Sequence, residues 1–258
     1  FGDVFANPTP RALASLLARG DVRESVSEAA DNYDYREIDR ALADNSLDSF
    51  RSGSARELGQ VLLTGATGFL GIHVLRELIR DPGARKIFCL MRSGRQKQFH
   101  ERLKNHLFYY FEDSYADLFG DRIIPLEGDI TEPASLTRLK DAGIDTVINC
   151  AANVTHFAKD DSIFKINTAG VDNLIDFCLE TGARLIQIST ASIAGFSVDG
   201  KPLPGEKLTE QGLYLGQNLE NQYAYSKFLA ERNLLAASAS RGLDAKIMRV
   251  GNLMARNS

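Results

Sequence analysis

The residues best suited to chemistry in this chain are Tyr223 and Lys227, which open a stretch of apolar residues with helical spacing. Four positions apart on a helix, the two side chains lie one turn apart on the same face. A tyrosine hydroxyl alone is a poor proton donor at neutral pH, but a neighbouring ammonium stabilises the tyrosinate and lowers the pKa of the phenol. The pair therefore predicts proton transfer to a reacting oxygen, and the ammonium could also bind a ribose. Tyr-x-x-x-Lys is common by chance, so a pair on a helix surface is the alternative.

A third hydroxyl is expected at the end of the strand that precedes this helix. The sequence offers Ser189, Thr190 and Ser192 there, and the residues alone leave the choice among the three open. His156, near the expected nicotinamide pocket, is as compatible with a substrate-facing role as with a purely structural one.

Far upstream of this group, a glycine loop follows the apolar run Val61–Leu63. A strand, a glycine turn and a helix in this order point backbone N–H groups at a pyrophosphate, where the helix dipole favours negative charge. The Lys-Ser/Thr ending of an ATP-binding P-loop is missing. The loop therefore predicts a bound dinucleotide, with a glycine turn that binds nothing as the alternative. The residues expected to contact the dinucleotide are Gly65, Thr67, Gly68, Phe69, Leu70 and Gly71.

The end of the second strand predicts which dinucleotide is bound. Proteins that prefer NAD carry Asp or Glu at this place, where the carboxylate holds the ribose 2′-hydroxyl. Here Arg92 stands instead, and a guanidinium suits a 2′-phosphate. The sequence therefore favours NADPH over NADH, although an exposed arginine without a ligand would look the same.

The ends of three later strands supply the remaining cofactor candidates. After the third strand, a carboxylate could accept a hydrogen bond from the adenine amino group. After the fourth, small residues would let the cofactor lie close, and after the sixth, backbone groups could hold the carboxamide. A surface turn and ordinary core packing explain the first two features nearly as well. The residues concerned are Asp129, Ile130, Ala151, Asn153, Val250 and Asn252.

Apolar runs of strand length alternate with helical patterns from residue 60 onward, and the elements that they form must position the reactive side chains. Such alternation predicts an α/β fold, a Rossmann-type doubly wound parallel sheet with helices on both faces. A long segment rich in Gly and Pro, residues 196–221, interrupts the pattern and is expected to be a functional loop. The predicted strands are 61–64, 86–91, 123–126, 146–150, 185–189 and 246–250, and the helical patterns run over 72–79, 99–111 and 163–179.

Composition excludes several other classes of protein. The 258 residues are 44% hydrophobic and 25% charged, which is ordinary for a globular protein with a sizeable core. A net charge of −4 argues against a nucleic-acid partner. No apolar stretch reaches the roughly 20 residues needed to span a bilayer, so we expect no membrane association. The three cysteines are far apart and lie in apolar runs, which predicts reduced thiols in a cytoplasmic protein and no metal site.

At these residues the chain resembles the extended short-chain dehydrogenases/reductases. It resembles more closely the thioester reductase domain that terminates nonribosomal peptide synthetases and the related domain of carboxylic acid reductases. The resemblance covers nearly the whole chain. The segments that carry it are 61–71, 89–93, 149–157, 189–195, 223–231 and 249–256, and residues 5–10 resemble the last helix region of a peptidyl carrier domain.

The resemblance implies a particular reaction. Its catalytic Thr, Tyr and Lys fall on Thr190, Tyr223 and Lys227, with Thr190 preferred because it lies five residues before Gly195. The implied substrate is an acyl or peptidyl thioester on the phosphopantetheine of a carrier domain. NADPH would reduce it to an aldehyde and a free thiol, and a second reduction could give an alcohol. A sugar-nucleotide epimerase or dehydratase and a non-catalytic NADP-sensing protein are the alternatives.

The resemblance also predicts how the chain is divided. Residues 1–20 are expected to be the remnant of a carrier domain, residues 21–57 a linker with a helix around 35–42, and residues 58–258 the NADP-binding Rossmann domain. Because the chain starts at Phe1, we expect it to be part of a larger polypeptide, and the smaller substrate-binding domain of the family is expected to be absent. We expect a monomer.

Overall fold

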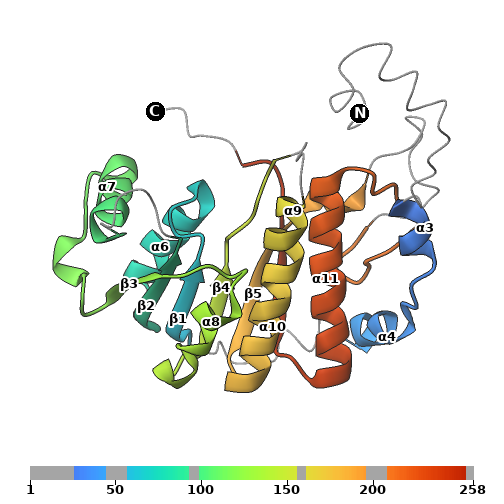
Figure 1. The fold of residues 1–258 in the computed structure, drawn as a ribbon, viewed down its shortest axis with the longest axis horizontal. Coiled ribbons are helices and arrows are strands. Elements are labelled where there is room, and N and C mark those ends of the chain that lie inside the picture. The colour runs from blue at the N-terminus through green and yellow to red at the C-terminus, as the bar shows by residue number, and fades with distance from the viewer. Residues whose placement is uncertain (1–25, 45–56, 93–98, 156–160, 196–207, 254–258) are drawn as a thin grey trace, which may run out of the picture.

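The computed structural model describes residues 26–44, 57–92, 99–155, 161–195 and 208–253. Six strands form one sheet in the order β3-β2-β1-β4-β5-β6, and every neighbouring pair is parallel (Figure 1). This is the Rossmann order, and it confirms the predicted fold class. The strands are β1 (Gly59–Thr64), β2 (Ala84–Met91), β3 (Ile123–Glu127), β4 (Thr146–Asn149), β5 (Arg184–Thr190) and β6 (Ala245–Val250).

Helices cover both faces of the sheet because successive strand residues point to opposite sides. Val61 and Leu63 pack with the helices of one face, whereas Leu62, between them, packs with those of the other. The first face carries α6 (Phe69–Arg80) and α7 (Phe99–Phe111), and the second carries α8 (Pro133–Thr137), α10 (Gly170–Thr181) and α11 (Gln222–Arg241). Short elements join them: η1 (Ala116–Leu118), η2 (Lys140–Ala142), α9 (Ser162–Phe164), the π-helical turn η3 (Lys165–Ala169) and η4 (Ala191–Ala194).

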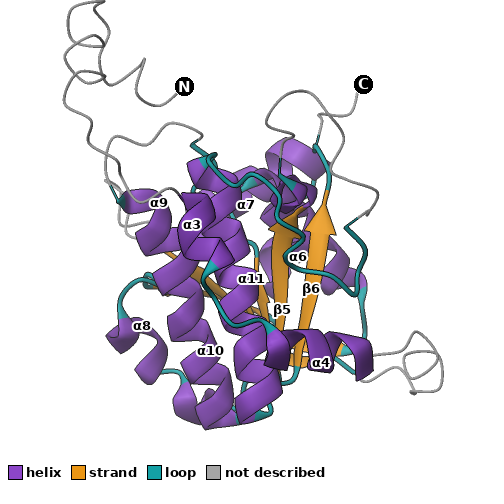
Figure 2. Cartoon of the chain, turned by 90° about the vertical axis from the view of Figure 1, so that its right-hand side faces the viewer, coloured by secondary structure: helices purple, strands orange, loops and turns teal. Residues whose placement is uncertain are grey.

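Part of the predicted linker is folded onto this domain. Helices α3 (Val26–Asp31) and α4 (Arg36–Asp44) lie beside α11 in Figures 1 and 2. Ile38 and Leu42 are buried against Phe228 of α11, and the ring of Tyr35 stacks on that of Tyr214 with centroids 5.1 Å apart. The helix predicted around residues 35–42 is present, and its apolar side chains explain why it is docked instead of free.

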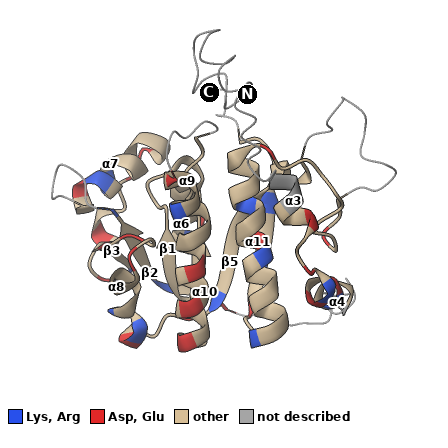
Figure 3. Ribbon diagram, turned by 45° about the vertical axis from the view of Figure 1, so that its right-hand side comes forward, with Lys and Arg blue, Asp and Glu red and all other residues tan. Residues whose placement is uncertain are grey.

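The parallel order brings the carboxyl ends of all six strands to one edge of the sheet. The glycine loop, Arg92, the 128–130 turn, the 150–153 turn, Thr190 and the 250–252 turn all follow strand ends, so they share this edge. Basic and acidic residues are interspersed along the helices that Figure 3 presents. Within the described ranges, no helix is both long and apolar enough to cross a membrane.

Candidate active site

The glycine loop is held by contacts that leave no room for side chains. Gly65 has a φ of +70°, and a Cβ built there would lie 2.6 Å from the backbone nitrogen of Ala151. Gly71 is buried in the first turn of α6, where a Cβ would overlap the carbonyl of Gly65. Gly71 therefore lets the start of α6 pack closely on the loop. Glycine is therefore required at both positions.

The start of α6 is suited to an anion. Its N-cap is the exposed Gly68, so no side chain of the described chain caps this end, and its first turn contains no acidic residue. The backbone N–H groups of Phe69, Leu70 and Gly71 have no partner within an α-helix, and they point out at the positive end of the helix dipole. Together with the half-buried Thr67, these residues fit a pyrophosphate.

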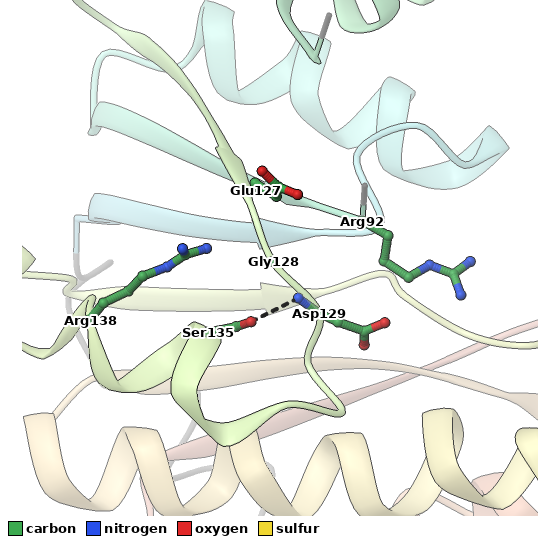
Figure 4. A pocket seen from close by; sticks show the side chains of 6 residues that line it. All are labelled: Arg92, Glu127, Gly128, Asp129, Ser135 and Arg138. Carbon is green, nitrogen blue, oxygen red and sulfur yellow. Dashed lines mark hydrogen bonds between the residues drawn. The ribbon is translucent and has the colours of Figure 1, made fainter. Parts of the chain in front are cut away.

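An open hollow of about 500 Å³ lies beyond the ends of β2 and β3 (Figure 4). The exposed Arg92 and the half-buried Asp129 line it on one side of Gly128, and Arg138 reaches toward Gly128 from the other. Asp129 is held in place by its own turn: its Oδ1 accepts from the N–H of Thr131 at 2.9 Å. The structure thus brings Arg92 and Asp129 together. It adds Arg138, which sequence reasoning missed because that residue follows a short helix, outside any recognised motif.

Ile130 follows Asp129 but faces the protein interior. Its side chain is 5% exposed and packs close to Gly170 of α10, and its carbonyl accepts a 2.8 Å hydrogen bond from Nδ2 of Asn173. Any contact of Ile130 with a cofactor is therefore left to its backbone N–H.

The 150–153 turn is tied to α11 through a buried asparagine. Asn167, in the π-helical turn, accepts from the N–H of Asn153 at 2.7 Å and donates back to its carbonyl at 2.9 Å. The same Nδ2 donates to Oγ of Ser226 at 3.0 Å, and that hydroxyl donates to the carbonyl of Tyr223 at 2.8 Å. Ala151, at the start of this turn, donates to Oδ1 of Asn149 at 3.1 Å. Turns of π-helix are frequent at functional sites, but no sequence signal marked Asn167.

Tyr223 and Lys227 lie in the first turns of α11, as predicted, and Thr190 ends β5. The hydroxyl of Thr190 lies close enough to that of Tyr223 to lower the pKa of the phenol by side-chain hydrogen bonding. Thr190 also accepts from the N–H of Ser192 at 3.1 Å, whereas Oγ of Ser189 is buried without a partner among the described residues. Of the three candidate hydroxyls, Thr190 is the one paired with the tyrosine. Two adjacent hydroxyls can hold a developing oxyanion.

Lys227 is almost fully buried, and its Nζ donates to the carbonyl of Ile188 at 2.7 Å. Burial lowers the pKa of Lys227 to about 8, and the carboxylate of Glu231 opposes that effect. The pKa of Tyr223 is raised by burial, with the hydrogen bond from Thr190 acting against it. The structure therefore does not show the lower tyrosine pKa expected from Lys227: burial has the largest effect on the phenol, and the ammonium donates to β5.

Of the remaining predicted site residues, Val250 lies beside Thr190. Val250 pairs with Thr190 across β5 and β6 and is half-buried, and Asn252 is exposed just after it. His156 lies outside the described residues. Within the described residues, no cluster of three or more His, Cys, Asp or Glu is placed to hold a metal ion.

A Rossmann sheet, a glycine loop at the start of α6 and a Thr-Tyr-Lys group at the same sheet edge define an oxidoreductase of the short-chain dehydrogenase/reductase type. The chain belongs to the NAD-binding family described as "Male sterility protein", whose model matches residues 63–258. Its cofactor is accordingly a nicotinamide dinucleotide.

Several proteins of known structure or activity are similar to the chain. The thiolation-reductase di-domain of an archaeal non-ribosomal peptide synthetase is 46% identical over 98% of this chain and 53% of its own, with a TM-score of 0.87. The terminal R domain of the myxalamid PKS-NRPS pathway is 29% identical over 83% of this chain and 55% of its own, with a TM-score of 0.59. The carboxylic acid reductase of Mycobacterium tuberculosis is 30% identical over 77% of this chain and 18% of its own length.

The predicted resemblance to terminal reductase domains is thus confirmed. The chain spans about half the length of these two solved structures and a smaller share of the carboxylic acid reductase.

Proposed function

We propose that this chain is the catalytic core of an NADPH-dependent thioester reductase. It releases an acyl or peptidyl chain from the phosphopantetheine thiol of a carrier domain as an aldehyde. The observation that carries the proposal is the closeness of the hydroxyls of Thr190 and Tyr223, at the sheet edge that also holds the glycine loop. The similarity to a thiolation-reductase di-domain supports a carrier domain as the partner.

The residues around the sheet edge fit NADPH. The N–H groups at the start of α6 would hold the pyrophosphate, and Arg92 the 2′-phosphate. Asp129 would accept from the adenine, and the turns after β4 and β6 would border the nicotinamide. Bound there, NADPH supplies a hydride to the thioester carbonyl carbon.

The chain's own residues handle the oxygen and the proton. The hydroxyls of Thr190 and Tyr223 would stabilise negative charge on the carbonyl oxygen, and Tyr223 would donate its proton to that oxygen. Lys227 would assist from the next turn of α11. The resulting hemithioacetal breaks its C–S bond to give the aldehyde and the free thiol, with the hydroxyl proton passing to sulfur.

The test is reduction of an acyl thioester by the full-length protein. NADPH absorbance would be followed with an acyl-loaded carrier domain and with acyl-CoA, and the aldehyde would be trapped as an oxime. Tyr223→Phe is expected to lower turnover by at least about a hundredfold, the usual contribution of a positioned acid, with NADPH still bound. Tyr225→Phe is the matched control, because its ring packs against that of Phe164 and borders the hydrophobic cluster that buries α4.

Three outcomes would contradict the proposal. Turnover of a sugar nucleotide without thioester reduction would favour an epimerase or dehydratase. Tight NADPH binding with no turnover of any substrate would favour a sensing role. Full activity of Tyr223→Phe would remove that residue from the role of acid.

A further inference from the structure

Helix α11 carries a third ionisable side chain in line with the catalytic pair. Tyr223, Lys227 and Glu231 are spaced four residues apart, so they lie on one face of the helix in successive turns. Lys227 is 3% exposed and Glu231 is 0% exposed. Two opposite charges are thus buried one helical turn apart, where water cannot screen them and each must influence the other strongly.

Arg249 of β6 completes this arrangement. Its guanidinium forms an ion pair with Glu231: Nε and Nη2 donate to Oε2 at 3.0 and 2.8 Å, and Nε also lies 3.3 Å from Oε1. Nη1 donates to the carbonyl of Thr209 and Nη2 to that of Gly212, each at 2.8 Å. Arg249 also pairs with Ser189 across β5 and β6, next to Thr190. Arg249 therefore joins α11, β5 and the segment that precedes α11.

We propose that Glu231 and Arg249 are positioning residues that set the protonation state of Lys227. Glu231 holds the lysine in its charged form, and Arg249 limits this effect by sharing the carboxylate. The titration of Lys227 is independent of the substrate, whereas its importance for turnover rests on the function proposed above.

The other groups that face Lys227 are neutral near pH 7. Cys150, from the turn after β4, contributes a thiol whose pKa burial raises to about 12. On the helix itself, burial also raises the pKa of the Tyr223 phenol. From β5, Lys227 meets the uncharged carbonyl of Ile188. Among the described residues, Glu231 is therefore the fixed charge that acts on Lys227, and Arg249 acts through its ion pair with that carboxylate.

This arrangement predicts opposite effects for its two members. Glu231→Gln removes the negative charge and leaves Arg249 nearby, so Lys227 should lose its proton at lower pH than in the wild type. Arg249→Gln leaves the carboxylate to Lys227 alone, so the lysine should lose its proton at higher pH. The double variant should fall between the wild type and Glu231→Gln, because desolvation remains while both charges are gone. A merely structural role would move both single variants in the same direction or neither.

The experiment is an NMR titration of the full-length protein labelled at the lysine ε-carbons, with the Lys227 signal assigned by its loss in Lys227→Met. The pH midpoints of the Lys227 titration in the two single variants should differ by at least about one pH unit, which is the usual effect of a nearby charge. Arg249→Lys keeps the positive charge and is the matched control, with a titration near that of the wild type. Should a single variant fail to fold, the double variant decides, because it leaves no unpaired buried charge.

The results separate this inference from the proposed function. Opposite shifts support the inference even if no thioester is reduced. Equal titration of Lys227 in the wild type, Glu231→Gln and the double variant overturns it, even if the reductase is active. If both ideas hold, the limb of the pH–rate profile that follows Lys227 moves in the same order as the NMR titration.

Discussion

Asn167 is expected to couple the cofactor side of the site to the catalytic helix, and Asn167→Ala tests this directly. The substitution removes three hydrogen bonds of a buried side chain, two with the backbone of Asn153 and one with Ser226. At about 1 kcal/mol each, the free energy of unfolding should fall by about 3 kcal/mol. For a domain of this size, that corresponds to a melting temperature lower by roughly 6–12 °C.

The matched control for this prediction is Asn173→Ala, on the following helix. Among the described residues, the side chain of Asn173 makes one hydrogen bond, of 2.8 Å to the carbonyl of Ile130, so Asn173→Ala should lower the free energy of unfolding by only about 1 kcal/mol. Because the Asn167 chain ends at the carbonyl of Tyr223, Asn167→Ala should also lower turnover, by up to about a hundredfold if the tyrosine shifts by 1 Å. Calorimetry and steady-state kinetics measure the two effects. Equal melting temperatures and equal turnover for the two variants would refute the reasoning.

Three further predictions follow from the structure. Arg92→Gln should weaken NADPH binding by about 10- to 100-fold and leave NADH binding nearly unchanged, because a charge-assisted contact contributes about 1.5–3 kcal/mol. Isothermal calorimetry measures the affinity for both cofactors, and equal losses of affinity would contradict the prediction. Gly71→Ala should displace the start of α6 and lower both stability and affinity for either cofactor, whereas Gly182→Ala, which has open space around it but a φ of +75°, should lower stability alone. Lys227→Met should raise the free energy of unfolding at pH 7 relative to the wild type. The pKa of Lys227 is about 8 in the folded protein and 10.5 ordinarily, so between these pH values the unfolded chain binds more protons and the stability of the wild type rises with pH. The difference in unfolding free energy between Lys227→Met and the wild type should therefore narrow over this range. A constant difference from pH 7 to 10.5 would contradict this prediction.

Much of the fold was predictable because its signals are local. Apolar runs such as Val61–Leu63 are long enough for a strand and too short for a helix, and their alternation with helical patterns allows few arrangements other than a parallel sheet. The docking of α3 and α4 was not predictable in the same way. Their apolar residues could be seen, but the surface that buries them, including Phe228 and Tyr214, comes from distant parts of the chain.

The candidate site, like the fold, was predictable only in its local features. By itself, the sequence determined the spacing of Tyr223 and Lys227 and the turn of the glycine loop, because both depend on backbone geometry over a few residues. The resemblance already favoured Thr190 over Ser189, but the contact with the tyrosine depends on how α11 packs against β5, which only the tertiary structure decides. The tertiary structure alone also brings Asn167 and Arg249 to α11. These contacts join residues 59 and 18 positions apart, and no local pattern records which side chains will meet once the sheet has formed.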